Sequence, residues 1–508
     1  MLCSLEYTRT RRTIGVAVCR PVISRVSENA ARGPIIPPHM HIEFSGAARE
    51  VTGSCHILRV GSGTKQRTVL LDCGMFQGKR SESRAKNAKL PVPVDEIDAV
   101  ILSHAHIDHA GRLPYLAAKG YKGTIWCTPA TRDLCAIMLA DSAHIQEKDA
   151  EFLARHRSEF IEPLYRMEDA TRTLELMVGM PLNKWFDVTD GVRAMFTEAG
   201  HILGSASITL EVRDGTEFRR VVFSGDVGRC NLPIIRDPQP PASGADVILC
   251  ESTYGDRDHE SVEGAREQLA AVVRETAARG GRVLIPAFAV GRTQELVYDL
   301  HALRRDGKIP DIPIFIDSPL ATDATAVFAM HPEAYDHNEE LVRQAPNLFD
   351  FPMVKFTRDV SESKRLNSMH GPMIVIAASG MAESGRILHH LRYGATDPRN
   401  TILVVGFMAE HTLGRRIVEQ RPVLRIFGEE VPLQAQVEIL NGYSAHADRT
   451  ELLAWLRTVR EHGVADGRGR PHVYLVHGEH EAQDAFAAQL RGDGFEVSIP
   501  SPGDVVSL

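Results

Sequence analysis

Three histidines and an aspartate lie within six residues in the segment HAHIDH, residues 104–109, directly after the apolar run IDAVILS. His104 and His106 alternate, so on an extended stretch both imidazoles reach the same side, and Asp108 and His109 follow where the backbone turns. Two histidines with one further nitrogen or carboxylate leave a zinc position open for water, as a catalytic site requires. The second close pair indicates a second metal ion, so the segment predicts a hydrolytic metal site.

Further chemistry-bearing residues follow apolar runs elsewhere in the chain. These are Asp72 after TVLL, Asp226 after RRVVFSG, Glu251 after ADVILC, His446 after QVEILNGYSA and His477 after HVYLV. His201, in EAGHILGSAS, and Asp226 would each be ordinary structural residues if they occurred alone. Continuous apolar runs are typical of strands buried on both faces of a layered α/β protein, where reactive residues gather at strand ends. We therefore expect six strand ends to meet at one edge and to build one site.

The segment between Glu251 and His446 has its own α/β pattern. SVEGAREQLAAVVRETAARGG predicts a helix that is capped by Ser261 and ends at Gly280 and Gly281. Four further strands are expected in GRVLIPAF, IPIFID, GPMIVIA and NTILVV. The middle of the chain is therefore expected to form an inserted domain.

Composition limits the class of protein. With 508 residues, 43% of them hydrophobic and 24% charged, the chain is expected to fold in water as more than one domain. A net charge of −8 argues against a generally basic nucleic-acid-coating surface, but a local basic cleft can coexist with it. The scattered cysteines are interpreted as reduced core thiols of a cytoplasmic protein: Cys3, Cys19, Cys55, Cys73, Cys127, Cys135, Cys230 and Cys250.

Residues 1–39 differ from the rest of the chain. They are arginine-rich (TRTRRT), poor in acids and closed by the turn-forming GPIIPPHM. We expect a disordered extension or a start upstream of the true one; an organelle-targeting segment is the alternative.

The ordered set of Asp72, HAHIDH, His201 and the SGD at Asp226 resembles the metallo-β-lactamase superfamily. The resemblance implies one metal held by His104, His106 and His201, a second held by Asp108, His109 and His477, and Asp226 as the bridge between them. It implies that Asp72 supports the ligands from behind. The usual metal is zinc, so two Zn²⁺ per chain are expected, with Mn²⁺ as the replacement that sequence leaves open.

Three later motifs narrow the resemblance. ILCESTYGDR, YSAHAD and YLVHGE are similar to motifs A, B and C of the β-CASP branch, whose members cleave nucleic acids. From about Met40 onward the chain resembles compact bacterial and archaeal ribonucleases related to RNase J and to the endonuclease subunit of pre-mRNA 3′-end processing. This implies a four-layer αβ/βα metallo-β-lactamase fold with an inserted α/β β-CASP domain. The expected parts are 1–39 as the extension, 40–255 and 441–508 as the metallo-β-lactamase domain, and 256–440 as the insertion.

The chemistry of phosphodiester hydrolysis agrees with these roles. The reaction needs an in-line nucleophile, relief of negative charge and a proton for the departing oxygen. Two metal ions would supply the nucleophile and relieve the negative charge. His446 would donate the proton if Glu251 orients the imidazole and raises the pKa of His446. The predicted catalytic residues are Asp72, Asp108, Glu251 and His446.

Loops of the insertion are candidates for gripping a sugar-phosphate chain. AFAVGRTQEL, DSPLAT and AASGMAESGR place Arg292, Ser318, Ser379 and Gly380 at turns where backbone N–H groups can cradle phosphate. Arg292 has an alternative as a helix-start arginine paired with a nearby acid. Arg386, in AASGMAESGR, is a further candidate with the same structural alternative as Arg292, whereas His389 and His390 have no motif that promotes them to site residues.

The preferred function is a metal-dependent ribonuclease that acts on single-stranded RNA through a metal-bound hydroxide. We expect endonuclease activity and, in addition, 5′-to-3′ exonuclease activity; a homodimer is implied only by resemblance, and no membrane is involved. A DNA nuclease of the same branch and a small-molecule hydrolase are the alternatives, but the second would not need Glu251, His446 or the insertion. A non-catalytic scaffold is disfavoured because no ligand position is lost.

Overall fold

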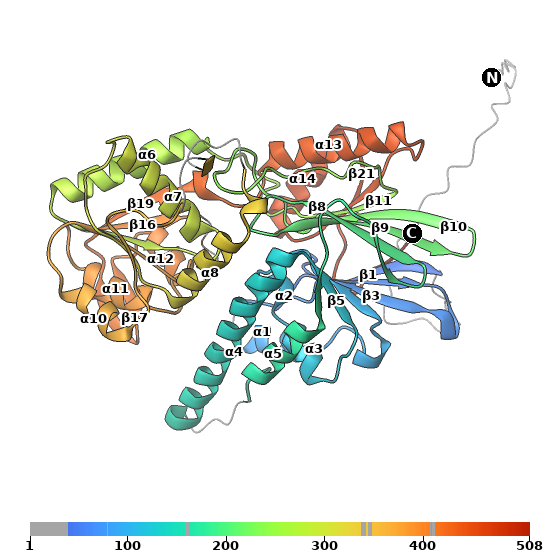
Figure 1. Ribbon diagram of the computed structural model, residues 1–508, viewed down its shortest axis with the longest axis horizontal. Coiled ribbons are helices and arrows are strands. Elements are labelled where there is room, and N and C mark those ends of the chain that lie inside the picture. The colour runs from blue at the N-terminus through green and yellow to red at the C-terminus, as the bar shows by residue number, and fades with distance from the viewer. Residues whose placement is uncertain are drawn as a thin grey trace, which may run out of the picture.

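The computed structural model describes residues 39–78, 80–157, 162–336, 342–343, 348–406, 408 and 412–508. All but the last residue of the expected 1–39 extension lies outside this range. Figure 1 shows two lobes, one built mainly from the first half of the chain with its C-terminal part, and one from the middle.

The first lobe contains two seven-stranded sheets. One has the order β22-β1-β2-β3-β4-β5-β6 and the other β21-β20-β11-β10-β9-β8-β7. The strands of the first are β1 Met40–Gly46, β2 Cys55–Val60, β3 Arg67–Leu71, β4 Ala99–Ile101, β5 Thr124–Cys127, β6 Met177–Gly179 and β22 Val505–Ser507. Those of the second are β7 Phe186–Thr189, β8 Val192–Glu198, β9 Ala206–Asp214, β10 Glu217–Phe223, β11 Val247–Cys250, β20 His472–Leu475 and β21 Glu496–Ser498.

The two sheets pack face to face, and helices cover their outer faces. One apolar cluster joins Ile42 and Leu71 of the first sheet to Phe196 and Leu210 of the second. The helices outside the first sheet are α2 Ile107–Ala110, α3 Leu113–Ala118, α4 Pro129–Arg157 and α5 Met167–Leu176, with α1 Arg80–Asn87 nearby; those outside the second are α13 Arg449–Ala465 and α14 His480–Gly492. This layering confirms the four-layer αβ/βα fold expected from sequence.

The second lobe is built on a six-stranded parallel sheet of order β14-β13-β15-β12-β16-β19. Its strands are β12 Arg282–Pro286, β13 Ile314–Ile316, β14 Val354–Phe356, β15 Met373–Ala377, β16 Thr401–Val405 and β19 Gln436–Leu440. Its helices are α6 Val262–Ala278, α7 Arg292–Arg305, α8 Pro319–Met330, α10 Val360–Ser368, α11 Ile387–Gly394 and α12 Leu413–Val418. The lobe also contains a hairpin of β17 Val423–Ile426 and β18 Glu429–Pro432. The four strands expected here are β12, β13, β15 and β16. The sheet also contains β14, whose residues VKF include an exposed lysine and form no continuous apolar run.

The helix expected at 261–281 is α6. The Ser261 hydroxyl accepts a hydrogen bond from the Gly264 N–H at 3.1 Å, and Leu269 and Val273 are fully buried on the inner face. Sheet membership changes between β11 and β12 and again between β19 and β20. The domain limits at 255/256 and 440/441 stay a prediction.

Two expectations were wrong in detail. The six strand ends do not share one edge, because β3 and β4 belong to the first sheet, β10, β11 and β20 to the second, and β19 to the third. In addition, β19 is an edge strand with several exposed residues, so it is not buried on both faces. The site therefore lies where loops from three sheets meet, which local apolar runs cannot reveal.

The six cysteines among the described residues are free thiols. Five are buried as expected, but Cys230 is exposed because it lies in the loop after Asp226 rather than in a strand. No helix within the described ranges is both long and apolar enough to cross a membrane.

Candidate metal centre

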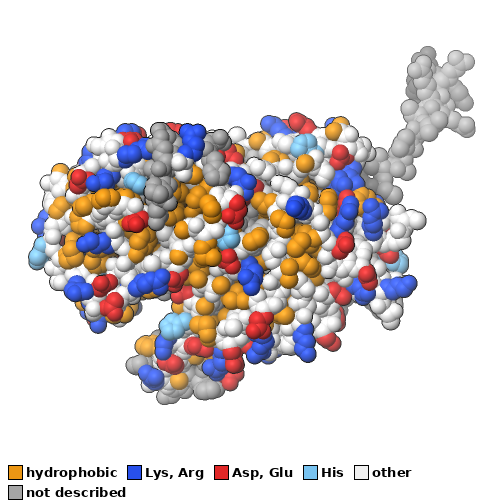
Figure 2. All heavy atoms as spheres, viewed as in Figure 1, with side chains coloured by type: hydrophobic (Ala, Val, Ile, Leu, Met, Phe, Trp, Pro, Cys, Tyr) orange, Lys and Arg blue, Asp and Glu red, His pale blue; other side chains and the backbone are white. Residues whose placement is uncertain are grey.

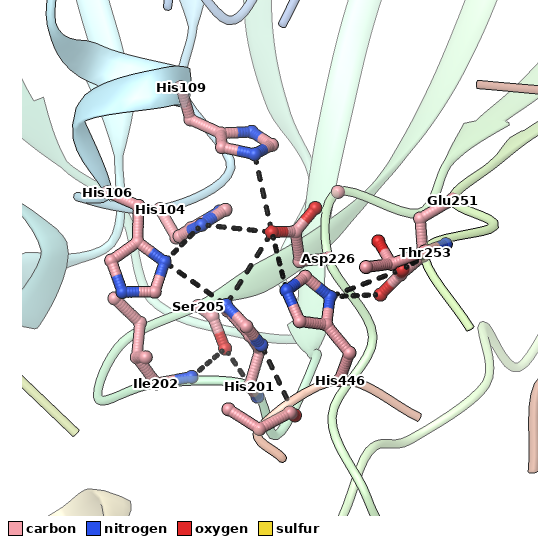
Figure 3. A network of polar contacts seen from close by, with 12 residues as sticks. His104, His106, His109, His201, Ile202, Ser205, Asp226, Glu251, Thr253 and His446 are labelled. Carbon is pink, nitrogen blue, oxygen red and sulfur yellow. Dashed lines mark hydrogen bonds and ion pairs between the residues drawn. The ribbon is translucent and has the colours of Figure 1, made fainter. Parts of the chain in front are cut away.

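The first group of converging side chains contains His104, His106, His201 and Asp226 (Figure 3). Nδ1 of His106 lies 3.2 Å from Nε2 of His104 and 3.1 Å from Nε2 of His201. Each of these Nε2 atoms is 3.5 Å from Oδ2 of Asp226. Three imidazole nitrogens and a carboxylate oxygen thus point at one small volume.

The second group contains Asp108, His109 and His477. Nε2 of His109 lies 3.2 Å from Nε2 of His477, which is 3.6 Å from Oδ2 of Asp108. Asp226 faces this group too, with Oδ2 at 3.3 Å from Nε2 of His109 and Oδ1 at 3.5 Å from Nδ1 of His477. All seven residues expected as ligands are therefore brought together, and Asp226 lies between the two groups.

The opposite ring nitrogens are held from behind. Asp72 Oδ2 lies 2.7 Å from Nδ1 of His109, and the same carboxylate accepts hydrogen bonds from the Ser54 hydroxyl and from the Ser103 N–H and hydroxyl. Nδ1 of His104 lies 3.0 Å from the Ser103 hydroxyl. These bonds fix the tautomer and the orientation of the rings.

Two further contacts complete this support. Nδ1 of His201 lies 3.2 Å from the Ala445 carbonyl, and Nδ1 of His477 lies 3.1 Å from the Thr253 hydroxyl. Sequence reasoning found Asp72 but missed Ser54, Ser103 and Thr253. Ser103 directly precedes HAHIDHAG and Thr253 lies two residues after Glu251, so adjacency to the motifs was the available signal.

The backbone is strained at two of these residues. Asp72 has φ +61° and His477 has φ +46°, a left-handed conformation that side chains other than glycine rarely adopt. The His477 N–H donates to the Ala47 carbonyl at 2.7 Å, which holds the strand end in place. Such strain persists only where the surrounding structure imposes it, as it commonly does at functional sites.

Burial sets the protonation of most of the group in the manner that a metal requires. It lowers the pKa of His106 to about 4 and the pKa of His104 and His201 well below the usual range. Burial alone would raise the pKa of Asp108. Its hydrogen bond to His477 and the charges of the nearby histidines outweigh burial and lower this pKa to about 2. Neutral imidazoles and ionised carboxylates are the ligand forms that bind metal ions.

One observation shows that protein groups alone do not satisfy this centre. Oδ1 of Asp226 is buried and has no hydrogen-bond partner among the described residues, although such atoms are nearly always paired. For His109, burial lowers the pKa, but Asp226 and Asp72 outweigh it and raise the pKa well above the usual range. The centre therefore favours positive charge, and its nitrogen and oxygen donors fit a borderline metal ion.

His446 and Glu251 lie beside the metal centre. Nδ1 of His446 is 3.1 and 3.2 Å from the two Glu251 oxygens, while its Nε2 faces Oδ2 of Asp226 at 4.0 Å. Glu251 is fully buried and also accepts the Val227 N–H at 2.7 Å. Burial lowers the pKa of His446, but the charges of Glu251 and Asp226 outweigh it and raise this pKa to about 9.

Backbone pairing explains why His446 is here. Gly228 and His446 form an antiparallel bridge, and the Ala447 N–H donates to the Val227 carbonyl at 2.7 Å. The segment that follows β19 is thereby attached to the segment that follows Asp226.

The residues expected to bind substrate lie in the second lobe. Arg292 is buried, pairs with Glu295 and lies over the Tyr443 ring at 5.6 Å, as its structural alternative predicts. Ser318 caps α8 by accepting from the Ala321 N–H. Ser379 accepts from the Glu383 N–H, and neighbouring Gly380 packs against a phenylalanine ring.

Arg386, a sequence candidate for a phosphate contact, and His390, which no motif promotes, bind a carboxylate of the second lobe. Both contact Asp317, at 2.7 Å each, and the Ser363 hydroxyl donates to Asp317 at 2.6 Å. These contacts give Arg386 and His390 a structural role as partners of Asp317.

Family comparisons agree with the architecture. The metallo-β-lactamase superfamily matches residues 48–274, the β-CASP domain matches 293–417, and the Zn-dependent metallo-hydrolase RNA specificity domain matches 430–500.

Relatives match over most of the chain. Ribonuclease TTHA0252 of Thermus thermophilus is 39% identical over 473 residues, which covers 92% of this chain and all of that protein. Transcription termination factor FttA is 30% identical in Methanosarcina mazei, covering 86% of this chain and 66% of that protein, and 30% identical in Thermococcus kodakarensis, covering 91% and 70%. The chain belongs to the β-CASP branch of the metallo-β-lactamase superfamily.

Proposed function

We propose that this protein is a metal-dependent ribonuclease that hydrolyses phosphodiester bonds of single-stranded RNA. The observation that carries the proposal is the position of Asp226, whose carboxylate lies within 3.5 Å of histidines from both ligand groups. A ribonuclease relative and the match to an RNA specificity domain support RNA as the substrate class.

Two ions are the proposed content of the centre, with zinc as the usual metal and manganese as the replacement. His104, His106 and His201 would hold one, Asp108, His109 and His477 the other, with Asp226 as the bridging ligand. When bound, such ions supply Lewis acidity, which activates water and neutralises phosphoryl charge. Asp72 keeps His109 oriented through its 2.7 Å contact.

His446 is the proposed proton donor to the departing oxygen. Its Nδ1 is occupied by Glu251, so the proton available to substrate is the one on Nε2, which faces the metal centre. Glu251 acts as a positioning residue, because it holds the ring and stabilises its protonated form.

Several finer points belong to the same proposal. Cleavage is endonucleolytic, with 5′-to-3′ exonuclease activity in addition, and the active form is a cytoplasmic homodimer. The loops bearing Arg292, Ser318, Ser379 and Gly380 contact the sugar-phosphate chain. Since Arg292 and Ser318 already have internal partners, the backbone N–H groups at these turns are the proposed contacts.

Incubation of the metal-loaded protein with 5′-labelled single-stranded RNA and with the matched DNA tests the proposal. We expect RNA cleavage that a chelator abolishes, with labelled fragments of several lengths and weaker action on DNA. Efficient cleavage of DNA alone would favour the DNA-nuclease alternative, and no cleavage of any RNA by protein with bound metal would refute the proposal.

His446→Ala tests the proton-donor role, and His480→Ala, an exposed histidine on α14, is the matched control. General acid catalysis typically contributes about 10²- to 10⁴-fold, so we expect His446→Ala to lose activity in that range on RNA. The loss should be much smaller on a phosphodiester with a p-nitrophenolate leaving group, which needs no proton. Equal losses on both substrates would contradict this role.

A further inference from the structure

Phe288 is an exposed aromatic residue in a loop that is otherwise buried. It is 43% exposed, whereas Ala287 is 1% and Ala289 7% exposed. Its carbonyl accepts hydrogen bonds from the Thr293 N–H at 3.2 Å and the Thr293 hydroxyl at 2.7 Å, at the start of α7. The ring is therefore held at the surface by a fixed backbone.

The same loop touches the segment that carries a proposed metal ligand. A Cβ placed on Gly291 would lie 3.2 Å from Cγ2 of Ile202, the residue that follows His201. Gly291 has φ +81°, so glycine both permits this close approach and suits the left-handed backbone. Ala289, Val290 and Ile202 share one apolar cluster. Phe288 is thus fixed on a loop that packs beside the metal centre.

The Phe288 ring also contacts the second loop expected to bind substrate. A Cβ on Gly380 would lie 2.7 Å from Cδ2 of Phe288, so the ring rests directly on the glycine backbone. Glycine at this position leaves no side chain to cover the ring. One part of the ring is supported by the protein and the rest is open to solvent.

On the face in Figure 2, charge alone does not mark a path for a nucleic-acid strand. The face in Figure 2 shows Lys and Arg interspersed with Asp and Glu around areas of hydrophobic side chains, without a continuous basic field. The net charge is −8. A single-stranded nucleic acid needs stacking surfaces as well as charge to bind, and aromatic rings stack on any base.

We propose that Phe288 is a stacking residue that receives one RNA base and thereby holds the strand in register with the metal centre. This inference rests on the proposed ribonuclease function. Stacking on Phe288 would be tolerant of base identity and would strengthen binding of one nucleotide at a fixed distance from the cleaved bond.

The test uses short 5′-labelled single-stranded RNAs in which one abasic site is moved along the strand. For the wild-type protein we expect an abasic site at one register from the cleaved bond to lower kcat/KM about tenfold, mainly through KM. Phe288→Ala should lower kcat/KM on intact RNA by a similar factor and should no longer distinguish intact RNA from the RNA that is abasic at that register.

Two further variants separate stacking from packing. Phe288→Leu keeps an apolar side chain on Gly380 but removes the ring, so it should behave as Phe288→Ala; Phe288→Tyr keeps the ring and should restore discrimination. Phe427→Ala is the matched control, because Phe427 is 52% exposed in the same lobe and its ring lies 4.7 Å from the ring of His389.

The outcomes are distinguishable from failure of the proposed function. If the wild-type protein cleaves no RNA, the ribonuclease proposal fails. If it cleaves RNA but no abasic position lowers kcat/KM, the stacking inference alone is overturned. The same holds if Phe288→Leu still distinguishes intact from abasic RNA, or if Phe427→Ala does not.

Discussion

Two buried aspartates, Asp226 in the first lobe and Asp317 in the second, both contact histidine and yet differ in their hydrogen-bond partners. Asp317 has hydrogen-bond partners at 2.6–2.7 Å on both oxygens. Asp226 has imidazole nitrogens at 3.3–3.5 Å, and its Oδ1 has no hydrogen-bond partner in the described parts of the chain.

The difference distinguishes a structural carboxylate from a ligand. Arg386 neutralises Asp317 directly, so that cluster is complete within the protein. The centre around Asp226 also contains Asp72, Asp108 and Glu251, and the possible ligand atoms of each group lie within 4.8 Å of one another. Histidine next to aspartate is therefore a weak signal, whereas several imidazole nitrogens that converge at 3.3–3.5 Å from one carboxylate indicate a cation site.

The largest expected effect is that of Asp226→Asn, which replaces the proposed bridging carboxylate by a neutral amide. Because changes behind the ligands already cost about 10- to 100-fold in metal affinity or activity, we expect RNA cleavage to fall by more than about 100-fold. Metal analysis of the purified protein should show fewer than two ions. Asp317→Asn is the control and should keep its metal. Equal metal loss in both variants would contradict the assignment of Asp226 as a metal ligand and Asp317 as a structural carboxylate.

Asp317→Asn should instead lower the free energy of unfolding. It leaves Arg386 and His390 facing a neutral amide in a buried position, and breaking a buried ion pair costs about 3 kcal/mol. Urea unfolding of the metal-free proteins measures this. Metal-free Asp226→Asn should lose less stability than metal-free Asp317→Asn, because the contacts of Asp226 are longer and its Oδ1 has no hydrogen-bond partner among the described residues. The opposite ranking would show that Asp226 is structural.

The smallest effect concerns His331, a histidine bonded on both sides by carboxylates. Its ring nitrogens lie 2.9 Å from Asp133 on α4 and 2.7 Å from Glu333. Burial lowers the pKa of His331, but these two hydrogen bonds outweigh it and raise the pKa in the folded state. The stabilisation is therefore complete below the unfolded pKa of about 6.5 and is lost as pH rises through the higher folded value.

The measurement is the difference in unfolding free energy between wild type and His331→Gln as a function of pH. We expect a larger difference at low pH than at high pH. The nearby charges that act on the group are Arg132, paired with Asp133, and Arg236, which faces Glu333. A difference for His331→Gln that does not change with pH would disprove the assignment.

The side chains that converge in the centre could be predicted partly from local spacing and partly from the resemblance to a known family. HAHIDH needed only its own spacing, and the four-layer fold with its insertion followed from the motifs. The catalytic and ligand roles remain predictions, but the structure brings those residues into one centre. The assembly from three sheets was not predictable, since strand order depends on contacts between distant segments.

The supporting hydroxyls and Phe288 were missed for a different reason. Serine and threonine occur in every kind of turn, so Ser103 and Thr253 gain a role only when their distance to a histidine ring is known. Phe288 lies in an apolar run in which its neighbours are buried, and nothing in the sequence distinguishes the exposed ring from the rest.

The contact between His109 and His477 joins residues 368 positions apart in the chain. During synthesis from the N-terminus, most of the proposed ligands emerge early, but the proposed proton donor His446 and the last ligand His477 emerge only after the whole second lobe. A partly made or truncated chain therefore lacks both. The order of residues along the polypeptide keeps the hydrolytic machinery incomplete until nearly all of the protein has been translated.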